Sequence, residues 1–190
     1  MSNYITSNFS NLIFSCSVPS QWHMEHRVTD HCVVFVRQGK LLISDKGRTE
    51  EIPAGSCVFL KKDCSVRLVK ASFAGKNYEG LNIRLPQNIL EDYFQRHLKN
   101  NEFSQDFTGL SNCFMRLNRT LCLQGLLSSI ILFVEEGQDP GQKMTELKVE
   151  ELILDLLQTN IRFFPTLFDF YRDWNVDLKE FMDCLLYTSP

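Results

Sequence analysis

Short apolar runs separated by turn residues dominate the stretch 31–69. The run 31–37 is apolar on both faces, whereas 65–69 alternates polar and apolar residues as a half-buried strand does. The strands predicted here are 31–37, 40–44, 49–52, 56–60 and 65–69. Gln38-Gly39 predicts a two-residue hairpin, because glycine reaches positive φ without a Cβ clash. Strands this short at this spacing predict a rolled antiparallel sandwich or barrel.

The flanks extend this strand-rich region to about residues 1–85. Residues 1–20 form a polar arm with one short apolar strand at 12–16, and 22–29 leads into the central run. Residues 78–85 alternate well enough to predict one more strand.

Pro86 marks a change to the helical period, because proline suits the first turn of a helix. The predicted helices are 87–99, about 112–136, 144–159 and a short packed helix within 163–174. Leu123, Leu127, Ile130 and Val134 form an apolar stripe on the second helix. Because only a short turn separates the second and third helices, we expect them to form an antiparallel helical hairpin. The fold class is therefore α+β, a small antiparallel β-barrel or roll followed by a helical segment.

Composition narrows the class of protein. The chain has 190 residues, 44% of them hydrophobic, which is enough for a sizeable core in one domain. Its net charge of −3 argues against direct DNA binding, since phosphate contacts require a basic face. The start has no signal-peptide pattern, and the most apolar segment, 126–134, is too short to span a bilayer. With seven cysteines, an odd and scattered set, we expect reduced thiols and a cytoplasmic location.

The last residues form two short units. Residues 175–183 begin a new helix, with Asp177 as a plausible N-cap. Residues 184–189 match the translated transposase end sequence of sequencing libraries, so we expect a non-native tail at 184–190.

Two motifs carry a family resemblance. The run 35–44, containing Gly-Lys-Leu-Leu-Ile, and the run 52–60, containing Ile-Pro-Ala-Gly, resemble the N-terminal regulatory domain of AraC-family transcription regulators. The ExsA-type subgroup is the more similar one, and the likeness covers roughly 30–183. The resemblance implies a cupin-like β-barrel at 1–85, a helical dimerisation segment at 86–174, and at 175–183 the truncated start of a helix-turn-helix domain.

This resemblance implies a regulator that senses an effector and dimerises. We expect a homodimer, an effector that is a protein or a small molecule, no membrane contact, and DNA binding only through the missing C-terminal domain. The apolar stripe Leu123, Leu127, Ile130 and Val134 is the expected dimer interface, although the same stripe would be core if it faced the barrel. Each buried leucine or isoleucine contributes about 1.5–3 kcal/mol, enough for four to sustain a dimer.

The barrel interior is the expected effector pocket. Its candidate lining is Trp22, Val34, Val36 and Phe59. This set is wholly apolar and lacks the polar anchors of a sugar site, so the alternative is that these side chains simply fill the core. That alternative would leave contact with a partner protein as the signal.

A cupin-type metal-dependent enzyme is the first rival interpretation, and a standalone protein-interaction module is the second. The enzyme needs several imidazole and carboxylate ligands on the barrel strands, but Val58 and Cys32 occupy expected ligand positions and only His26 lies near one. We therefore expect no catalytic residue, no metal and no cofactor. His23, His26 and His31 are a possible pH-sensitive group, with His23 and His26 able to meet on a helical turn.

Two cysteines offer one more alternative. Cys57 and Cys64 flank Lys61 and Lys62, whose charges can lower a thiol pKa and so permit redox sensing. The simpler interpretation places Cys57 inward on a strand and Cys64 in a turn.

Overall fold

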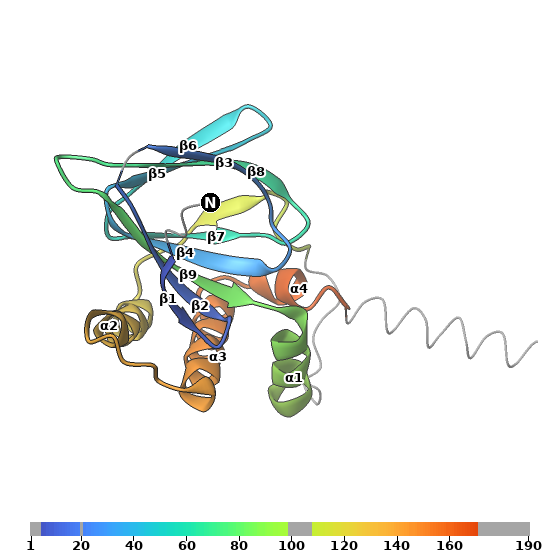
Figure 1. The fold of residues 1–190 in the computed structure, drawn as a ribbon. Coiled ribbons are helices and arrows are strands. Elements are labelled where there is room, and N and C mark those ends of the chain that lie inside the picture. Colours follow the sequence, from blue (N-terminus) through green and yellow to red (C-terminus); the bar gives the residue numbers. More distant parts are fainter. Residues whose placement is uncertain (1–4, 20, 99–107, 171–190) are drawn as a thin grey trace, which may run out of the picture.

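The computed structural model describes residues 5–19, 21–98 and 108–170, which form two facing sheets and a layer of helices (Figure 1). The segments expected as a helix-turn-helix start (175–183) and a non-native tail (184–190) lie outside these residues. The two sheets are separate and do not close into a barrel, so the fold is an antiparallel β-roll with a helical segment.

All strand pairs are antiparallel. Sheet A has the order β1-β2-β9-β4-β7-β10, and sheet B has the order β3-β8-β5-β6. Sheet A consists of β1 (Ile5–Phe9), β2 (Ile13–Val18), β4 (His31–Gln38), β7 (Ser56–Leu60), β9 (Tyr78–Leu85) and β10 (Phe114–Arg116). Sheet B consists of β3 (Trp22–Arg27), β5 (Lys40–Asp45), β6 (Arg48–Pro53) and β8 (Ser65–Ala71).

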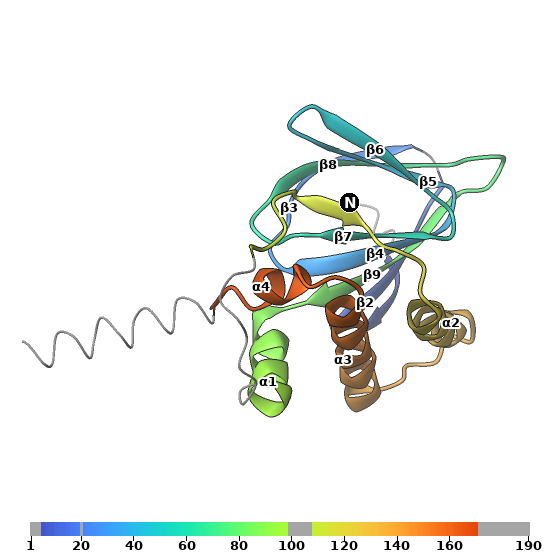
Figure 2. The same ribbon diagram turned by 180° about the vertical axis from the view of Figure 1, so that it is seen from behind.

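The helices cover the face of sheet A that points away from sheet B (Figures 1 and 2). They are α1 (Gln87–His97), α2 (Leu121–Glu135), α3 (Gln142–Thr159) and α4 (Phe163–Leu167). The strand β4 therefore lies between two layers, which explains why its sequence is apolar on both faces. Among the described residues, no helix combines the length and the apolar character needed to cross a membrane.

The predicted hairpin at Gln38-Gly39 is wrong. Strand β4 pairs with β7 and β9 in sheet A, whereas β5 pairs with β6 and β8 in sheet B. Gly39 is instead the corner where the chain crosses between sheets. Its φ is +71°, and a Cβ there would lie 2.6 Å from the carbonyl oxygen of Ala71. A turn signal cannot tell a hairpin from a crossing, because both need the same backbone freedom.

The N-terminal part contains two strands that the sequence did not predict. Residues 5–9 lie in the expected polar arm but pair with β2, and residues 22–27 form β3. Both are edge strands of their sheets, so one side of each is solvated and its apolar signal is weak.

The predicted helix 112–136 starts nine residues too early. Residues 114–116 pair with β7 as a strand, and α2 begins only at Leu121. Thr120 caps it, because its side-chain oxygen accepts a hydrogen bond from the backbone N–H of Leu123 at 2.9 Å. The first helix was predicted correctly, with Pro86 at its N-cap.

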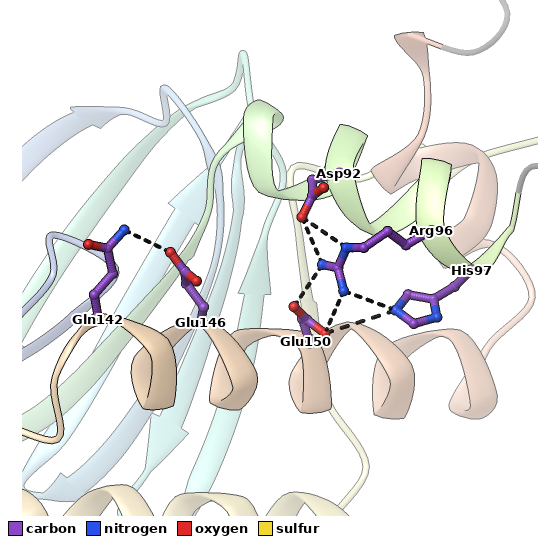
Figure 3. A network of polar contacts seen from close by, with 6 residues as sticks. All are labelled: Asp92, Arg96, His97, Gln142, Glu146 and Glu150. Atoms are coloured by element: carbon purple, nitrogen blue, oxygen red, sulfur yellow. Dashed lines mark hydrogen bonds and ion pairs between the residues drawn. The ribbon is translucent and has the colours of Figure 1, made fainter.

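Polar contacts tie the first and third helices together (Figure 3). Arg96 of α1 donates from Nη2 to Asp92 on its own helix and to Glu150 of α3, both at 2.8 Å. These two carboxylates raise the pKa of Arg96, which therefore stays charged. A second contact, from Gln142 to Glu146, lies along α3 itself.

Candidate functional site

A small cavity lies between the two sheets. It has a volume of about 90 Å³, with walls from β2, β4, β7 and β9 on one side and β3, β5 and β8 on the other. Most of the wall is apolar and includes Val34, Leu41 and Leu68. We call this space the inter-sheet cavity.

Polar groups also reach the inter-sheet cavity. Lys70 of β8 donates from Nζ to the Sγ of Cys16 at 3.3 Å, and its Nζ lies 5.4 Å from the ring centroid of Tyr78. The Tyr78 hydroxyl and the Asn82 Oδ1 are buried and have no hydrogen-bond partner within the described part of the chain. Because an unpaired buried polar atom is costly, these atoms indicate a site that a polar ligand or water completes.

The electrostatics of the inter-sheet cavity favour an anion. Burial raises the pKa of Tyr78, so its hydroxyl stays protonated at neutral pH. Burial, and secondarily the charge of Lys70, lowers the pKa of His26. Lys70 is the one lysine or arginine among the lining residues, and none of them is acidic. A carboxylate could therefore pair with Lys70 and accept a hydrogen bond from Tyr78.

The four residues expected to line an effector pocket divide between two places. Val34 lines the inter-sheet cavity, Val36 is fully buried in the same core, and Trp22 packs against that core with Lys70 over its ring. Phe59 was assigned to the wrong face. It pairs across the sheet with Val33 and packs on the helix side, edge-on to Phe163 at 5.0 Å. Cross-strand neighbours share a face, so the register of β4 and β7, which the sequence does not reveal, decides this.

The apolar stripe of α2 packs inward in the single chain. Leu123, Leu127 and Ile130 are buried in the helix-side core, and Val134 packs partly buried against it. The expected dimer interface is therefore corrected: these side chains cover sheet A, the alternative that the sequence left open. A stripe of four apolar residues indicates that one face of a helix is buried. It does not distinguish burial against the chain's own sheet from burial against a second copy.

The three neighbouring histidines do not converge. His23 is exposed on β3, His26 points into the inter-sheet cavity, and His31 is buried on the helix side of β4. The expected helical turn for His23 and His26 is a strand instead. Within the described ranges, no group of three or more histidine, cysteine, aspartate or glutamate side chains could hold a metal ion.

The two cysteines considered for redox sensing lie in different environments. Cys57 is buried, and burial raises its pKa to about 12, although Arg119 acts in the opposite direction. Cys57 is therefore a neutral thiol at neutral pH. Cys64 is partly exposed in the turn before β8, as the simpler interpretation predicted.

Sequence reasoning missed the polar anchors of the inter-sheet cavity. The predicted strand 65–69 stopped one residue before Lys70, which continues the inward positions of Val66 and Leu68. A lysine at an inward position of an alternating strand is the signal that could have identified the site. Tyr78 and Asn82 occupy inward positions of β9 in the same way.

The fold resembles solved regulatory proteins. Apo ToxT from Vibrio cholerae strain SCE256, in a variant form, superimposes with a TM-score of 0.57 at 12% identity, covering 80% of this chain and 58% of that one. Wild-type ToxT bound to an unsaturated fatty acid gives a TM-score of 0.54 at 13% identity, covering 77% and 53%. The chain thus spans little more than half the length of these proteins. An RmlC-like cupin protein from Methanocaldococcus jannaschii gives a TM-score of 0.34 at 13% identity, covering 39% and 68%.

A β-roll backed by a helical layer is the architecture of AraC-type regulatory domains, the class to which ToxT belongs. The family model of the ExsA N-terminal regulatory domain matches residues 31–163, well over half of the chain. The chain therefore belongs to the ExsA N-terminal regulatory domain family, and it is a regulatory domain of an AraC-family regulator. No curated protein matches its sequence.

Proposed function

We propose that this regulatory domain senses an effector in the inter-sheet cavity and dimerises through its helical layer, and that it is not a catalyst. DNA contact would fall to a helix-turn-helix domain elsewhere in a longer regulator, since the net charge of −3 does not favour phosphate binding.

The observation that carries the sensing role is the buried hydroxyl of Tyr78 beside Lys70, which has no hydrogen-bond partner among the described residues. A ligand that carries a carboxylate would satisfy the Tyr78 hydroxyl and neutralise Lys70. One structural neighbour, wild-type ToxT from Vibrio cholerae, was solved with an unsaturated fatty acid bound, and a fatty acid is also a carboxylic acid. The volume of about 90 Å³ limits the ligand here to a small acid.

Thermal unfolding in the presence of acetate, butyrate or hexanoate tests this role. A ligand that binds only the folded state raises the Tm by mass action, and Lys70→Met should abolish the rise. Butanol is the neutral control and should give no rise. An equal shift in the wild-type and Lys70→Met proteins, or no shift with any acid, would contradict sensing at this cavity.

The exposed apolar side chains of the helical layer support dimerisation. Leu121 and Leu132 of α2 are 87% and 60% exposed, and their spacing of eleven places them on one face of the helix. Gly125 and Ser128 lie between them on that face, so a second helix could approach closely. Leu147 and Leu154 form a similar exposed pair on α3. A second copy of the chain would remove these side chains from water.

Light scattering on size-exclusion fractions tests the dimer. Leu132→Asp should convert a dimer to a monomer, because a buried unpaired carboxylate is costly. Phe73→Asp is the matched control, since Phe73 is 58% exposed but lies in the loop after β8, away from the helices. An unchanged mass for Leu132→Asp would exclude this face of α2.

A further inference from the structure

A second, larger cleft lies on the other side of sheet A, between α2 and the adjoining turns. Its volume is about 570 Å³, within the range typical of small-molecule sites. It shares no lining residue with the inter-sheet cavity. We call it the α2 cleft, and its defining residues are Phe35, Arg116, Arg119, Leu123, Leu127 and Ile131.

The floor of the α2 cleft is apolar. Leu123 and Leu127 are buried at its base, while Phe35 and Ile131 are partly buried and pack against the helix-side core. Cys57 also lines the floor, and as a neutral thiol it adds no charge. The outer rim is polar and formed by residues 53–56 and 116–119. An apolar floor below a polar rim suits a ligand with one apolar end and one polar end.

The charge of the α2 cleft has one sign. Arg116 and Arg119 are its charged lining residues, and no aspartate or glutamate lines it. Arg116 donates from Nη2 to the Ser56 hydroxyl at 2.9 Å, which leaves its other N–H groups available. Arg119 has no hydrogen bond or ion pair with any described residue, and its Nη1 lies over the turn at Gly55. Within the described residues neither arginine forms an ion pair, so the cleft carries positive charge on a chain whose net charge is −3.

From these observations we propose that the α2 cleft binds an organic anion with an apolar body. The body would lie on Phe35, Leu127 and Ile131, and a carboxylate or similar anionic group would pair with Arg116 and Arg119. Guanidinium groups match carboxylates in geometry and stay charged at any physiological pH, so the charge preference is built into the site. This site is independent of the small acid proposed for the inter-sheet cavity.

Calorimetric titration with 4-phenylbutyrate and its neutral amide, 4-phenylbutyramide, tests the proposal. Both probes offer the same apolar body, and only the acid carries a charge. We expect the acid to bind at least about tenfold more tightly than the amide, as expected for a charge-assisted hydrogen bond. Arg116→Gln combined with Arg119→Gln should remove this difference and leave the affinity for the amide unchanged. Arg67→Gln, on the exposed face of sheet B, is the matched control and should change neither affinity.

Two further variants separate the α2 cleft from the inter-sheet cavity. Ala54→Phe, on the rim of the cleft opposite α2, would fill its entrance and should abolish binding of both probes, whereas Lys70→Met should affect neither. If Lys70→Met abolishes binding of the acid and the double arginine variant does not, the acid occupies the inter-sheet cavity and the proposal is wrong. Equal affinity for acid and amide, or no saturable binding of the acid, would also overturn it. If Ala54→Phe fails to fold, the double arginine variant still decides.

Discussion

The two faces of sheet A are built from the same strands but filled in different ways. On the helix side, Phe59 and Leu85 pack without exposure against α4 and its neighbours in a large cluster of aromatic and aliphatic side chains. On the side of sheet B, the strands leave a cavity with Lys70, Tyr78 and Asn82 at its wall. The helix side is closely packed over its centre, with the α2 cleft at its edge and one buried nitrogen, His31 Nε2, that has no hydrogen-bond partner among the described residues. The cavity side instead gathers two such oxygens, of Tyr78 and Asn82, beside one lysine. The two faces therefore differ in packing: the centre of the helix side is filled by side chains, whereas the other side keeps a cavity with polar groups in its wall.

Replacing one leucine on each face by alanine should give the largest changes in the free energy of unfolding. The difference between the two losses tests whether the faces are packed differently. Leu85→Ala removes a side chain that is 1% exposed from the filled side and should lower the free energy of unfolding by about 3–4 kcal/mol. Leu41→Ala on the cavity side should cost only about 2 kcal/mol, since Leu41 lines the inter-sheet cavity and has fewer side-chain contacts to lose. Urea denaturation of both variants measures the difference. Equal losses would mean that the two faces are equally well packed.

Among the described residues, His31 points into the helix side and His26 into the cavity side. The pH dependence of stability therefore gives a second comparison of the two faces. Burial, and then the charge of Lys62, lowers the pKa of His31 on the helix side from 6.5 to about 4, although Asp169 opposes the shift. The unfolded chain therefore binds a proton at His31 before the folded chain does. Stability should fall as the pH decreases from 6.5 towards 4, by about 3 kcal/mol in total.

Denaturation at several pH values checks this prediction. His31→Gln should flatten the decline, and His26→Gln should flatten it less, because His26 is only partly buried on the cavity side. A profile in His31→Gln as steep as that of the wild-type protein would assign the acid sensitivity to other groups.

The sequence predicted the strongly periodic parts of the fold and missed what depends on pairing partners. Strand β4 and helices α1 and α3 were predicted because their apolar patterns are long and clear. The corner at Gly39 was read as a hairpin, since one glycine permits both. Phe59 was placed in the wrong layer because alternation identifies two faces but not which layer covers each.

The candidate site shows the same limit. Val34 lines the inter-sheet cavity, but the polar anchors of this cavity were missed because Lys70 follows the end of the predicted strand. The sequence identified the stripe on α2 as apolar. Only the three-dimensional packing shows that these side chains face sheet A. The available signal was a single polar residue at an inward strand position. Such a residue is overlooked when the predicted strand ends before it.

Removing an unpartnered hydroxyl from the cavity side should have a smaller effect of opposite sign. Tyr78→Phe deletes a buried Oη that has no partner in the described residues, so the protein without ligand should become more stable by about 1 kcal/mol. Differential scanning calorimetry measures the shift in Tm. The same variant should bind small carboxylates less tightly, which separates a ligand-binding hydroxyl from a structural one. A loss of stability would show that solvent already satisfies this oxygen.

The smallest expected effect concerns the junction of α1 and α3 on the filled face. Arg96→Met removes the contacts to Asp92 and Glu150 but keeps the length of the side chain (Figure 3). Because the Arg96 side chain is 42% exposed, screening by solvent limits the loss to about 0.5–1 kcal/mol. Chemical denaturation at low and high salt measures it, with the wild-type protein losing the advantage at high salt. A loss of several kcal/mol would mean that packing alone does not hold α1 and α3 together, and that the rigidity of the helix side depends on this ion pair.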